Sequence, residues 1–373
     1  MPARLIVAAS DTNADMLYAS GFRVPDPFVF VESQGRKAIL LSDLEVDRGR
    51  REAKVDVVES YSELESKLRG SRKAPCRFEE VVAAFAKKHR ATRPLVPEDF
   101  PLGLAVALEK LGVKVKPVSG HFWPEREIKT PTELRAITAA VRITELGMER
   151  AFEVLKASRA RKDRKLVWKG AVLTSERLRA EIEATMLYAG GAALTQSIVA
   201  CGEQACDPHE RGHGPLKADE LIILDIFPRA AKSGFYGDLT RTVVRGRATE
   251  AQRRLWETCL EGQKRALKAL KSGADGKRIQ DDVREFFTKS GYPTEQRNGR
   301  WQGFFHGLGH GLGLDLHELP RIAATTLEPG QVFTIEPGIY VPGVGGVRHE
   351  DDVVITASGC RLLSRVAKPF EIR

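Results

Sequence analysis

One segment, residues 303–318, constrains the fold of this chain more than any other. It reads GFFHGLGHGLGLDLHE and holds three histidines, one aspartate and one glutamate among five glycines. Histidine is the commonest metal ligand and the usual acid/base side chain near neutral pH. Glycine lets the backbone turn sharply or pass close to a ligand. We therefore expect the rest of the chain to bring carboxylates to this segment.

The first third of the sequence predicts an α/β domain. At 373 residues the chain is long for one core, so two domains are expected. Up to residue 119, short runs rich in β-branched residues alternate with helical patterns, and no phosphate-binding loop occurs among them. We expect a structural or assembly role for this domain. The predicted strands are residues 5–8, 28–32, 38–42, 55–58, 95–97 and 113–118, and the predicted helices are residues 61–68, 78–89 and 102–111.

A domain boundary is predicted near residue 125. Residues 120–129 read as a linker, and Thr130, Pro131 and Glu133 then supply an N-cap, a proline at the first helical position and a capping-box glutamate. Apolar residues recur at helical spacing behind this start, which predicts a long amphipathic helix. The two domains are therefore assigned to residues 1–124 and 125–373.

The order of the later elements suggests two similar halves in the second domain, each with helices followed by strands. The expected helices are residues 175–188, 250–271 and 277–290, and the expected strands are residues 197–200, 221–227, 238–244, 332–336 and 347–356.

Composition excludes several classes of protein. The net charge of +9 is spread along the chain, and its densest run, residues 156–169, is typical of a solvated helix end, so no specific nucleic-acid partner is expected. Five cysteines without a C-x-x-C pair indicate neither a disulfide framework nor a zinc finger. The apolar N-terminal stretch is too short for a signal peptide or a membrane span, so we expect a cytoplasmic protein without a membrane partner.

Four carboxylates stand where apolar strands begin or end, and together with His310 they form a candidate ligand set. A lone carboxylate beside a buried strand is costly unless it is paired or bound to metal, and a hairpin could bring two of them to one face. Two divalent ions would neutralise four negative charges. Oxygen-rich ligands with one imidazole favour manganese or cobalt, with iron or zinc as alternatives. The four carboxylates are Asp225, Asp238, Glu336 and Glu350.

The ordered motifs LDIF, GDLTRT, HGLGHGLGLDLHE, TIEPGIY and VRHED resemble the superfamily of methionine aminopeptidase, aminopeptidase P, prolidase and creatinase, peptidase family M24. The resemblance implies a pita-bread catalytic domain after a creatinase-like α/β domain, and a homodimer. It implies two metal ions held by the five ligands, with Asp238 and Glu350 bridging and a hydroxide between the ions as nucleophile. It also implies Glu336 as general base. His209, preferred over nearby His213, and His306 and His317 match the family's substrate-side histidines.

Methionine aminopeptidases usually lack the N-terminal domain, so the resemblance, taken with the two-domain layout, implies hydrolysis of an Xaa-Pro bond near the N-terminus of a peptide. Arg321 matches a position where some prolidases hold the proline carboxylate, which favours an Xaa-Pro dipeptidase. Arg348 is expected near the site too, where it orients the bridging Glu350 or meets substrate. One departure from the family is the spacing of Asp225 and Asp238, which are thirteen residues apart rather than eleven.

Three alternatives stay open from the sequence. An aminopeptidase P would act on longer peptides with proline at the second position. A creatinase-type enzyme would need no metal, although this chain keeps all five ligands. A non-catalytic pita-bread module that binds a partner is the alternative outside the enzymes.

Overall fold

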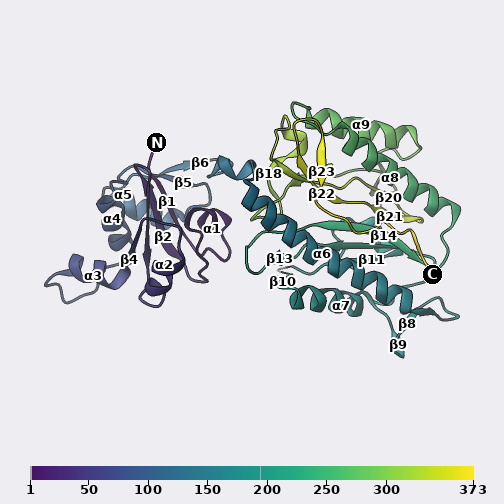
Figure 1. Cartoon of the computed structure of the whole chain (residues 1–373), viewed down its shortest axis with the longest axis horizontal. Helices are drawn as coiled ribbons and strands as arrows, with labels where there is room; N and C mark the ends of the chain where they lie inside the picture. Colours follow the sequence, from purple (N-terminus) through teal and green to yellow (C-terminus); the bar gives the residue numbers. More distant parts are fainter. Residues whose placement is uncertain (1, 194) are drawn as a thin grey trace. The chain divides into compact units, whose positions relative to one another are not determined.

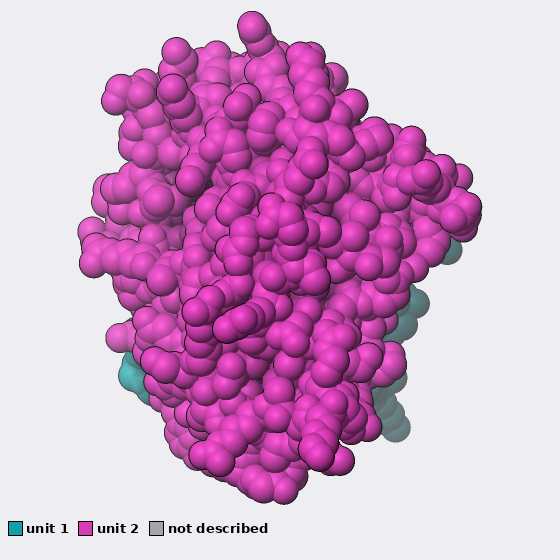
Figure 2. Space-filling model, turned by 90° about the vertical axis from the view of Figure 1, so that its right-hand side faces the viewer, with its two compact units in different colours: residues 1–124 teal, residues 125–373 magenta. Residues whose placement is uncertain are grey.

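The computed structural model describes residues 2–193 and 195–373. The chain divides into two compact units, residues 1–124 and 125–373, which Figure 2 colours teal and magenta. All five cysteines are free thiols. Among the helices of the described residues, none has the length and apolar character needed to cross a bilayer.

A mixed six-stranded sheet forms the centre of the first unit, as its sequence predicts. Alternate residues of β2 face opposite ways: Val29 and Val31 pack with α4, while Phe28 and Phe30 pack with α1. The short helices α1 and α2 were not predicted, because seven residues show little periodicity. The sheet order is β4-β3-β2-β1-β5-β6. The elements are β1 (Arg4–Ala8), α1 (Ala14–Ser20), β2 (Phe28–Ser33), β3 (Arg36–Leu41), α2 (Val46–Glu52), β4 (Val57–Ser60), α3 (Tyr61–Arg69), α4 (Phe78–Lys88), β5 (Leu95–Pro97), α5 (Leu102–Lys110) and β6 (Lys116–Val118).

The second unit opens with the predicted long helix, α6 (Pro131–Ala157). Thr130 and Glu133 close the capping box: the Glu133 N–H donates to Thr130 Oγ1 at 3.3 Å, and the Thr130 N–H donates to Glu133 Oε2 at 2.8 Å. The apolar face of α6 and helix α7 (Ser175–Tyr188) pack on one sheet. Its order is β11 (Ile198–Cys201), β12 (Leu221–Ile226), β14 (Leu239–Arg245) and β24 (Glu371–Ile372).

A second pair of helices, α8 (Glu250–Ala269) and α9 (Gly276–Lys289), packs on the other strands of this unit. In Figure 1 α8 and α9, in green, lie on one side of the strands and α7, in teal, lies on the other. Each half thus combines a helix pair with a sheet, in keeping with the repeated order in the sequence. The sheet order is β18 (Glu318–Arg321), β17 (His310–Gly311), β19 (Val332–Ile335), β22 (Asp351–Ile355) and β23 (Cys360–Leu362).

Shorter elements connect these parts. They are η1 (Pro124–Glu127), β7 (Arg159–Ala160), β8 (Leu166–Trp168), β9 (Ala171–Val172), β10 (Gly191–Ala192), η2 (Gly202–Cys206), β13 (Arg229–Ala230), β15 (Glu295–Arg297), β16 (Arg300–Gln302), η3 (Ile322–Ala324), β20 (Gly338–Val341) and β21 (Gly345–Arg348).

Two glycines allow the close backbone approaches that the site needs. A Cβ at Gly237 would lie 2.6 Å from the backbone nitrogen of Val141 on α6, and a Cβ at Gly309 would lie 1.8 Å from the carbonyl oxygen of Thr334. Both glycines stand next to predicted ligands, Asp238 and His310. A side chain at either position would displace backbone, so these ligands depend on glycine beside them.

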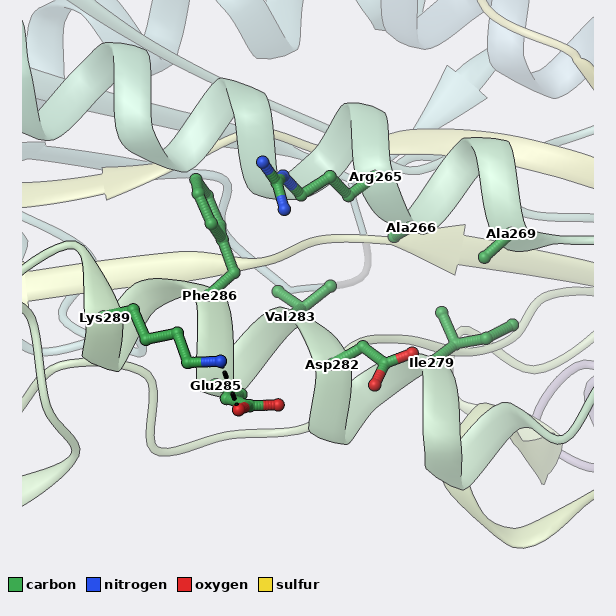
Figure 3. Close-up of a pocket in the computed structure, with 9 residues that line it drawn as sticks. All are labelled: Arg265, Ala266, Ala269, Ile279, Asp282, Val283, Glu285, Phe286 and Lys289. Carbon is green, nitrogen blue, oxygen red and sulfur yellow. Dashed lines mark ion pairs between the residues drawn. The ribbon is translucent and has the colours of Figure 1, made fainter.

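A pocket of about 360 Å³ lies between α8 and α9 (Figure 3). Ile279, Val283 and Phe286 form its apolar lining, and a salt bridge between Lys289 and Glu285 lies at its edge, with 2.6 Å between Nζ and Oε1. None of the residues predicted for the site lines this pocket.

Candidate metal centre

The two aspartates predicted as ligands come from neighbouring antiparallel strands. Asp225 on β12 lies opposite Thr240 on β14, and Asp238 immediately precedes β14. Because opposed residues share a face of a sheet and alternate residues return to it, Asp225, Thr240 and Asp238 share one face. The longer spacing is taken up between the strands, where β13 forms and pairs with β10.

Glu336 and Glu350 meet through the register of β19 and β22. Thr334 lies opposite Asp352, while Ile335 lies opposite Asp351. Glu336 is two residues beyond Thr334 and Glu350 is two residues before Asp352, so both glutamates share the face of that pair. Asp351 points the other way.

Hydrogen bonds join the two sheets at this face. Thr240 Oγ1 donates to Glu350 Oε2 at 2.6 Å, and the Glu350 N–H donates to the Thr240 carbonyl at 3.1 Å. The Asp238 N–H donates to Asp352 Oδ2 at 3.0 Å. The carboxylates of both sheets are therefore held in one place.

His310 completes the set from β17. Its backbone N–H donates to Thr334 Oγ1 at 3.1 Å, and its ring Nδ1 lies 3.0 Å from the Gly311 carbonyl oxygen. That contact leaves Nε2 towards the carboxylates, at 3.5 Å from Glu336 Oε1 and 3.7 Å from Asp238 Oδ2. Ligand atoms of Asp238, His310 and Glu350 all lie within 4.8 Å of one another.

Burial and crowding shift the protonation of this cluster. Burial, followed by the neighbouring carboxylates, raises the pKa of Asp238 and of Glu350 well above ordinary values. Burial raises the pKa of Glu336 to about 7. Burial also lowers the pKa of His310 to about 3, so its imidazole is neutral at pH 7, the form that binds metal.

The residues fit a divalent cation. Asp225 Oδ1 and Asp238 Oδ1 are buried, and neither accepts a hydrogen bond from the described residues. A buried carboxylate oxygen without a donor is costly. A cation would satisfy both oxygens and remove the repulsion that raises the carboxylate pKa values.

Arg348 differs from its predicted role. It was expected to orient Glu350 or to meet substrate, but its guanidinium donates to Asp225 Oδ2 at 2.7 Å and is only 4% exposed. The same guanidinium donates to Tyr340 Oη at 2.9 Å, to Thr240 Oγ1 at 3.2 Å and to the Pro208 carbonyl at 3.4 Å. These protein contacts occupy the guanidinium, so it positions Asp225.

The three histidines predicted to meet substrate divide into two kinds. His306 is half-buried and uses both ring nitrogens, since Nε2 lies 2.9 Å from Tyr340 Oη and Nδ1 lies 2.8 Å from the Gly307 carbonyl oxygen. His317 is exposed, and its ring centroid lies 4.4 Å from that of His310. His209 is also exposed. Burial, the largest effect, lowers the pKa of His306 to about 3 and also lowers the pKa of His317. His306 is thus engaged within the protein, whereas His317 and His209 are open to solvent.

Arg321 lies directly opposite His310 in the β17–β18 pair and is exposed. Its charge lowers the pKa of His310 and of His317, after the larger effect of burial. The Arg321 guanidinium thus stands beside the predicted ligand cluster and faces solvent, where a substrate group could reach it.

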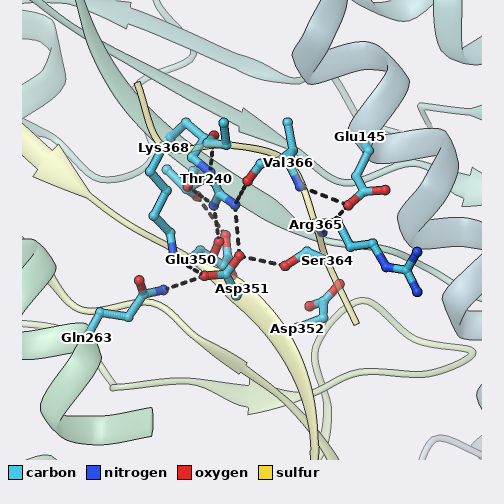
Figure 4. Close-up of polar contacts among 12 residues, drawn as sticks. Glu145, Thr240, Gln263, Glu350, Asp351, Asp352, Ser364, Arg365, Val366 and Lys368 are labelled. Carbon is cyan, nitrogen blue, oxygen red and sulfur yellow. Dashed lines mark hydrogen bonds and ion pairs between the residues drawn. The ribbon is translucent and has the colours of Figure 1, made fainter. Parts of the chain in front are cut away.

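Behind the ligand face lies a buried polar network (Figure 4). Asp351 accepts hydrogen bonds from Arg241 Nη2 at 2.8 Å, Lys368 Nζ at 2.5 Å, Ser364 Oγ at 2.6 Å and Gln263 Nε2 at 3.2 Å. Arg241 Nη1 also donates to the Glu350 carbonyl at 2.5 Å. Burial opposes ionisation of Asp351, but Arg241 and Lys368 lower its pKa below the ordinary value. The network fixes the chain at Glu350 and Asp351.

Replacing Arg241 by methionine is expected to lower the free energy of unfolding by about 3–5 kcal/mol, since the change leaves a buried carboxylate without its main partner. Urea denaturation of the chelated protein measures this. Arg253 pairs with Glu371 at 2.6 Å but is 40% exposed, so Arg253→Met is the control. A cost of about 1 kcal/mol or less is expected there, and equal losses in the two variants would contradict the role of the network.

Four residues that support this site were not singled out from the sequence: Thr240, Arg241, Tyr340 and Asp352. Thr240, Arg241 and Tyr340 lie within the quoted motifs GDLTRT and TIEPGIY, and Asp352 stands two residues after Glu350 in a predicted strand and so shares its face. Their supporting roles depend on contacts that the sequence did not predict, such as Thr240 with Glu350 and Arg241 with Asp351.

Comparisons with known proteins identify similar sequences and structures. The profile of a family described as metallopeptidase family M24 matches residues 135–357. An Xaa-Pro dipeptidase of Pyrococcus furiosus is 34% identical over 266 residues, which cover 70% of each chain. An X-Pro aminopeptidase from Thermotoga maritima superposes with a TM-score of 0.81 at 25% identity, over 100% of this chain and 98% of that one. A prolidase structure from Pyrococcus furiosus gives 0.77 at 25% identity, over 98% and 97% of the two chains.

Proposed function

Because the chain belongs to metallopeptidase family M24, we propose that it hydrolyses the Xaa-Pro bond at the N-terminus of short peptides, with Xaa-Pro dipeptides as preferred substrates. One observation carries this assignment: Asp238, His310 and Glu350 form a buried cluster with metal-ligand spacing, and the exposed Arg321 lies beside it. The names of the relatives described above support the substrate class.

We propose that Asp225, Asp238, His310, Glu336 and Glu350 hold two divalent ions, with Asp238 and Glu350 shared between them. Manganese suits four carboxylates and one imidazole best, and cobalt, zinc or iron are the alternatives. Bound divalent ions of this kind supply a Lewis acid and a water that is deprotonated near neutral pH.

Glu336 is the proposed general base. Its carboxylate lies in the cluster, with Oε1 3.5 Å from His310 Nε2, and can accept the proton of the attacking water and return it. The acceptor on the substrate is the proline nitrogen, which has no hydrogen in an Xaa-Pro bond and must gain one as it leaves. His306 is occupied within the protein, so exposed His317 and His209 are assigned to the oxyanion.

Arg321 is the proposed partner for the free carboxylate of a dipeptide. An arginine fork suits a carboxylate, since it can donate two parallel hydrogen bonds. Arg348 does not compete for this role, because its guanidinium already binds Asp225, Tyr340 and backbone.

We further propose that the first unit is the creatinase-like domain, that it mediates a homodimer, and that the protein acts in the cytoplasm. Family resemblance supports these points. Sedimentation equilibrium of the full chain tests the dimer, and a mass equal to one chain at micromolar concentration would contradict it.

Substrate preference tests the dipeptidase assignment. The manganese-loaded protein is expected to bind about two ions per chain and to cleave Ala-Pro with a higher kcat/KM than Ala-Pro-Ala. Arg321→Met is expected to raise KM for Ala-Pro by about 10- to 100-fold, the cost of a charged hydrogen bond, with a smaller effect on Ala-Pro-Ala. Preference for the tripeptide would instead assign the protein as an Xaa-Pro aminopeptidase.

Fewer than one manganese ion per chain would contradict the dinuclear site.

A further inference from the structure

A buried carboxylate outside the ligand set stands among the proposed substrate residues. Glu318 directly follows His317 and precedes Arg321 by three positions. Its side chain is only 2% exposed, and the two cations that meet it, Arg126 and Lys129, are 5% and 3% exposed. The three residues form a buried charged group, called here the Glu318 clamp.

Each oxygen of Glu318 has a cationic partner. Arg126 Nη2 donates to Oε2 at 2.5 Å and Lys129 Nζ donates to Oε1 at 2.5 Å. Lys129 Nζ also donates to the Arg126 carbonyl, and Arg126 Nη2 reaches Asp315 Oδ2 at 2.8 Å. Burial alone would raise the pKa of Glu318, but Lys129 and Arg126 lower it, so this carboxylate is ionised.

The same carboxylate also binds the turn that leads to His317. The N–H groups of Leu314 and Asp315 donate to Glu318 Oε2 at 3.0 and 3.3 Å. A Cβ at Gly313 would lie 2.5 Å from that oxygen, so the carboxylate fills the inside of the turn. The pairing of β17 with β18 fixes the position of this turn less firmly, because the register of the two strands shifts between His310 and Gly311.

We propose that Glu318, held by Arg126 and Lys129, is a positioning residue that sets His317 and Arg321 for substrate and thereby determines the preference for dipeptides. The inference rests on the proposed function, in which Arg321 binds the free carboxylate. A buried ion pair contributes little net stability compared with apolar side chains of similar size, but it specifies one arrangement of the groups it joins. Here it joins the segment before α6 to the turn that carries His317 and to strand β18, which ends at Arg321.

The test compares Glu318→Gln and Lys129→Met with Glu181→Gln, which removes a 2.6 Å ion pair with Arg150 between α6 and α7. Steady-state kinetics on Ala-Pro and Ala-Pro-Ala, manganese content and amide hydrogen exchange at Leu314 and Asp315 are measured on the full chain. Glu318→Gln is expected to raise KM for Ala-Pro by about tenfold or more, with kcat/KM for Ala-Pro-Ala within about threefold. Manganese content stays unchanged and exchange at both amides accelerates. Lys129→Met gives a smaller change in the same direction.

A parallel loss on both substrates, a fall in manganese content, or a substrate ratio equal to that of Glu181→Gln would each overturn the proposal. If Glu318→Gln does not fold, the ratio of kcat/KM for Ala-Pro to that for Ala-Pro-Ala is measured for Lys129→Met instead. That variant keeps Arg126 and the hydrogen bonds from Glu318 to the turn. If the wild type cleaves neither substrate, the proposed function fails and the specificity role fails with it. Exchange at Leu314 then still reports whether Glu318 holds the turn.

Discussion

Asp238→Asn is expected to abolish tight binding of divalent metal and to lower kcat/KM for Ala-Pro by at least about 1000-fold, more than the roughly 10- to 100-fold cost of losing an outer-shell partner. Asp238 is 4% exposed and shares the cluster with His310 and Glu350. Its loss leaves too little negative charge for two divalent ions. Manganese content and initial rates measure both effects, and a variant with about two ions and near wild-type rates would remove Asp238 from the ligand set.

The same substitution should act in the opposite direction on the metal-free protein. Burial and the charges of Glu350, Asp225, Asp352 and Glu336 all disfavour ionised Asp238. Asparagine relieves this repulsion at neutral pH, so the chelated variant should melt at a higher temperature than the chelated wild type. Manganese should then raise the melting temperature of the wild type only, because a ligand stabilises the state that binds it. A lower melting temperature for the chelated variant than for the chelated wild type would show that repulsion among the buried carboxylates does not dominate the stability of this site.

Glu336→Gln is the second large effect, with kcat expected to fall by about 100- to 10,000-fold, the usual contribution of a general acid/base group. The amide keeps the shape of the side chain but cannot accept the proton of the attacking water. It also weakens one ligand position, so manganese content is measured beside kcat to separate the two losses. Glu328→Gln is the control, since Glu328 is exposed and outside the cluster. A Glu336→Gln variant that keeps kcat within about tenfold would show that another group moves the proton.

Local patterns predicted much of the fold. The Thr130 capping box starts α6 where the sequence places it, and most strands of the first unit lie where β-branched runs occur. The α/β architecture and the pita-bread relationship are confirmed. These features depend on neighbours in sequence, on hydrophobic period and on ordered motifs, which is why one chain suffices to predict them.

The candidate site was predictable as a set of residue types rather than as a geometry. Four of the five ligands were chosen because carboxylates beside apolar strands need a partner, and His310 was chosen from the histidine-rich segment. Which acid of the run Glu350, Asp351 and Asp352 faces the cluster depends on the register of β19 and β22. Arg348 was assigned to Glu350 because it stands two residues away, whereas in the fold it reaches Asp225, 123 positions distant.

The sequence by itself determined that residues 303–318 would need carboxylates from elsewhere, and it named those carboxylates by type and order. Only the tertiary structure decided how the segment is held. The backbone N–H of His310 is bound by Thr334 and its ring Nδ1 lies beside the Gly311 carbonyl oxygen, which leaves Nε2 towards the cluster. The Glu318 side chain is bound by Arg126 and Lys129 instead. The physical reason is that charge and residue type are local properties of a chain. The partner that satisfies a buried charge is chosen by packing between segments almost two hundred residues apart.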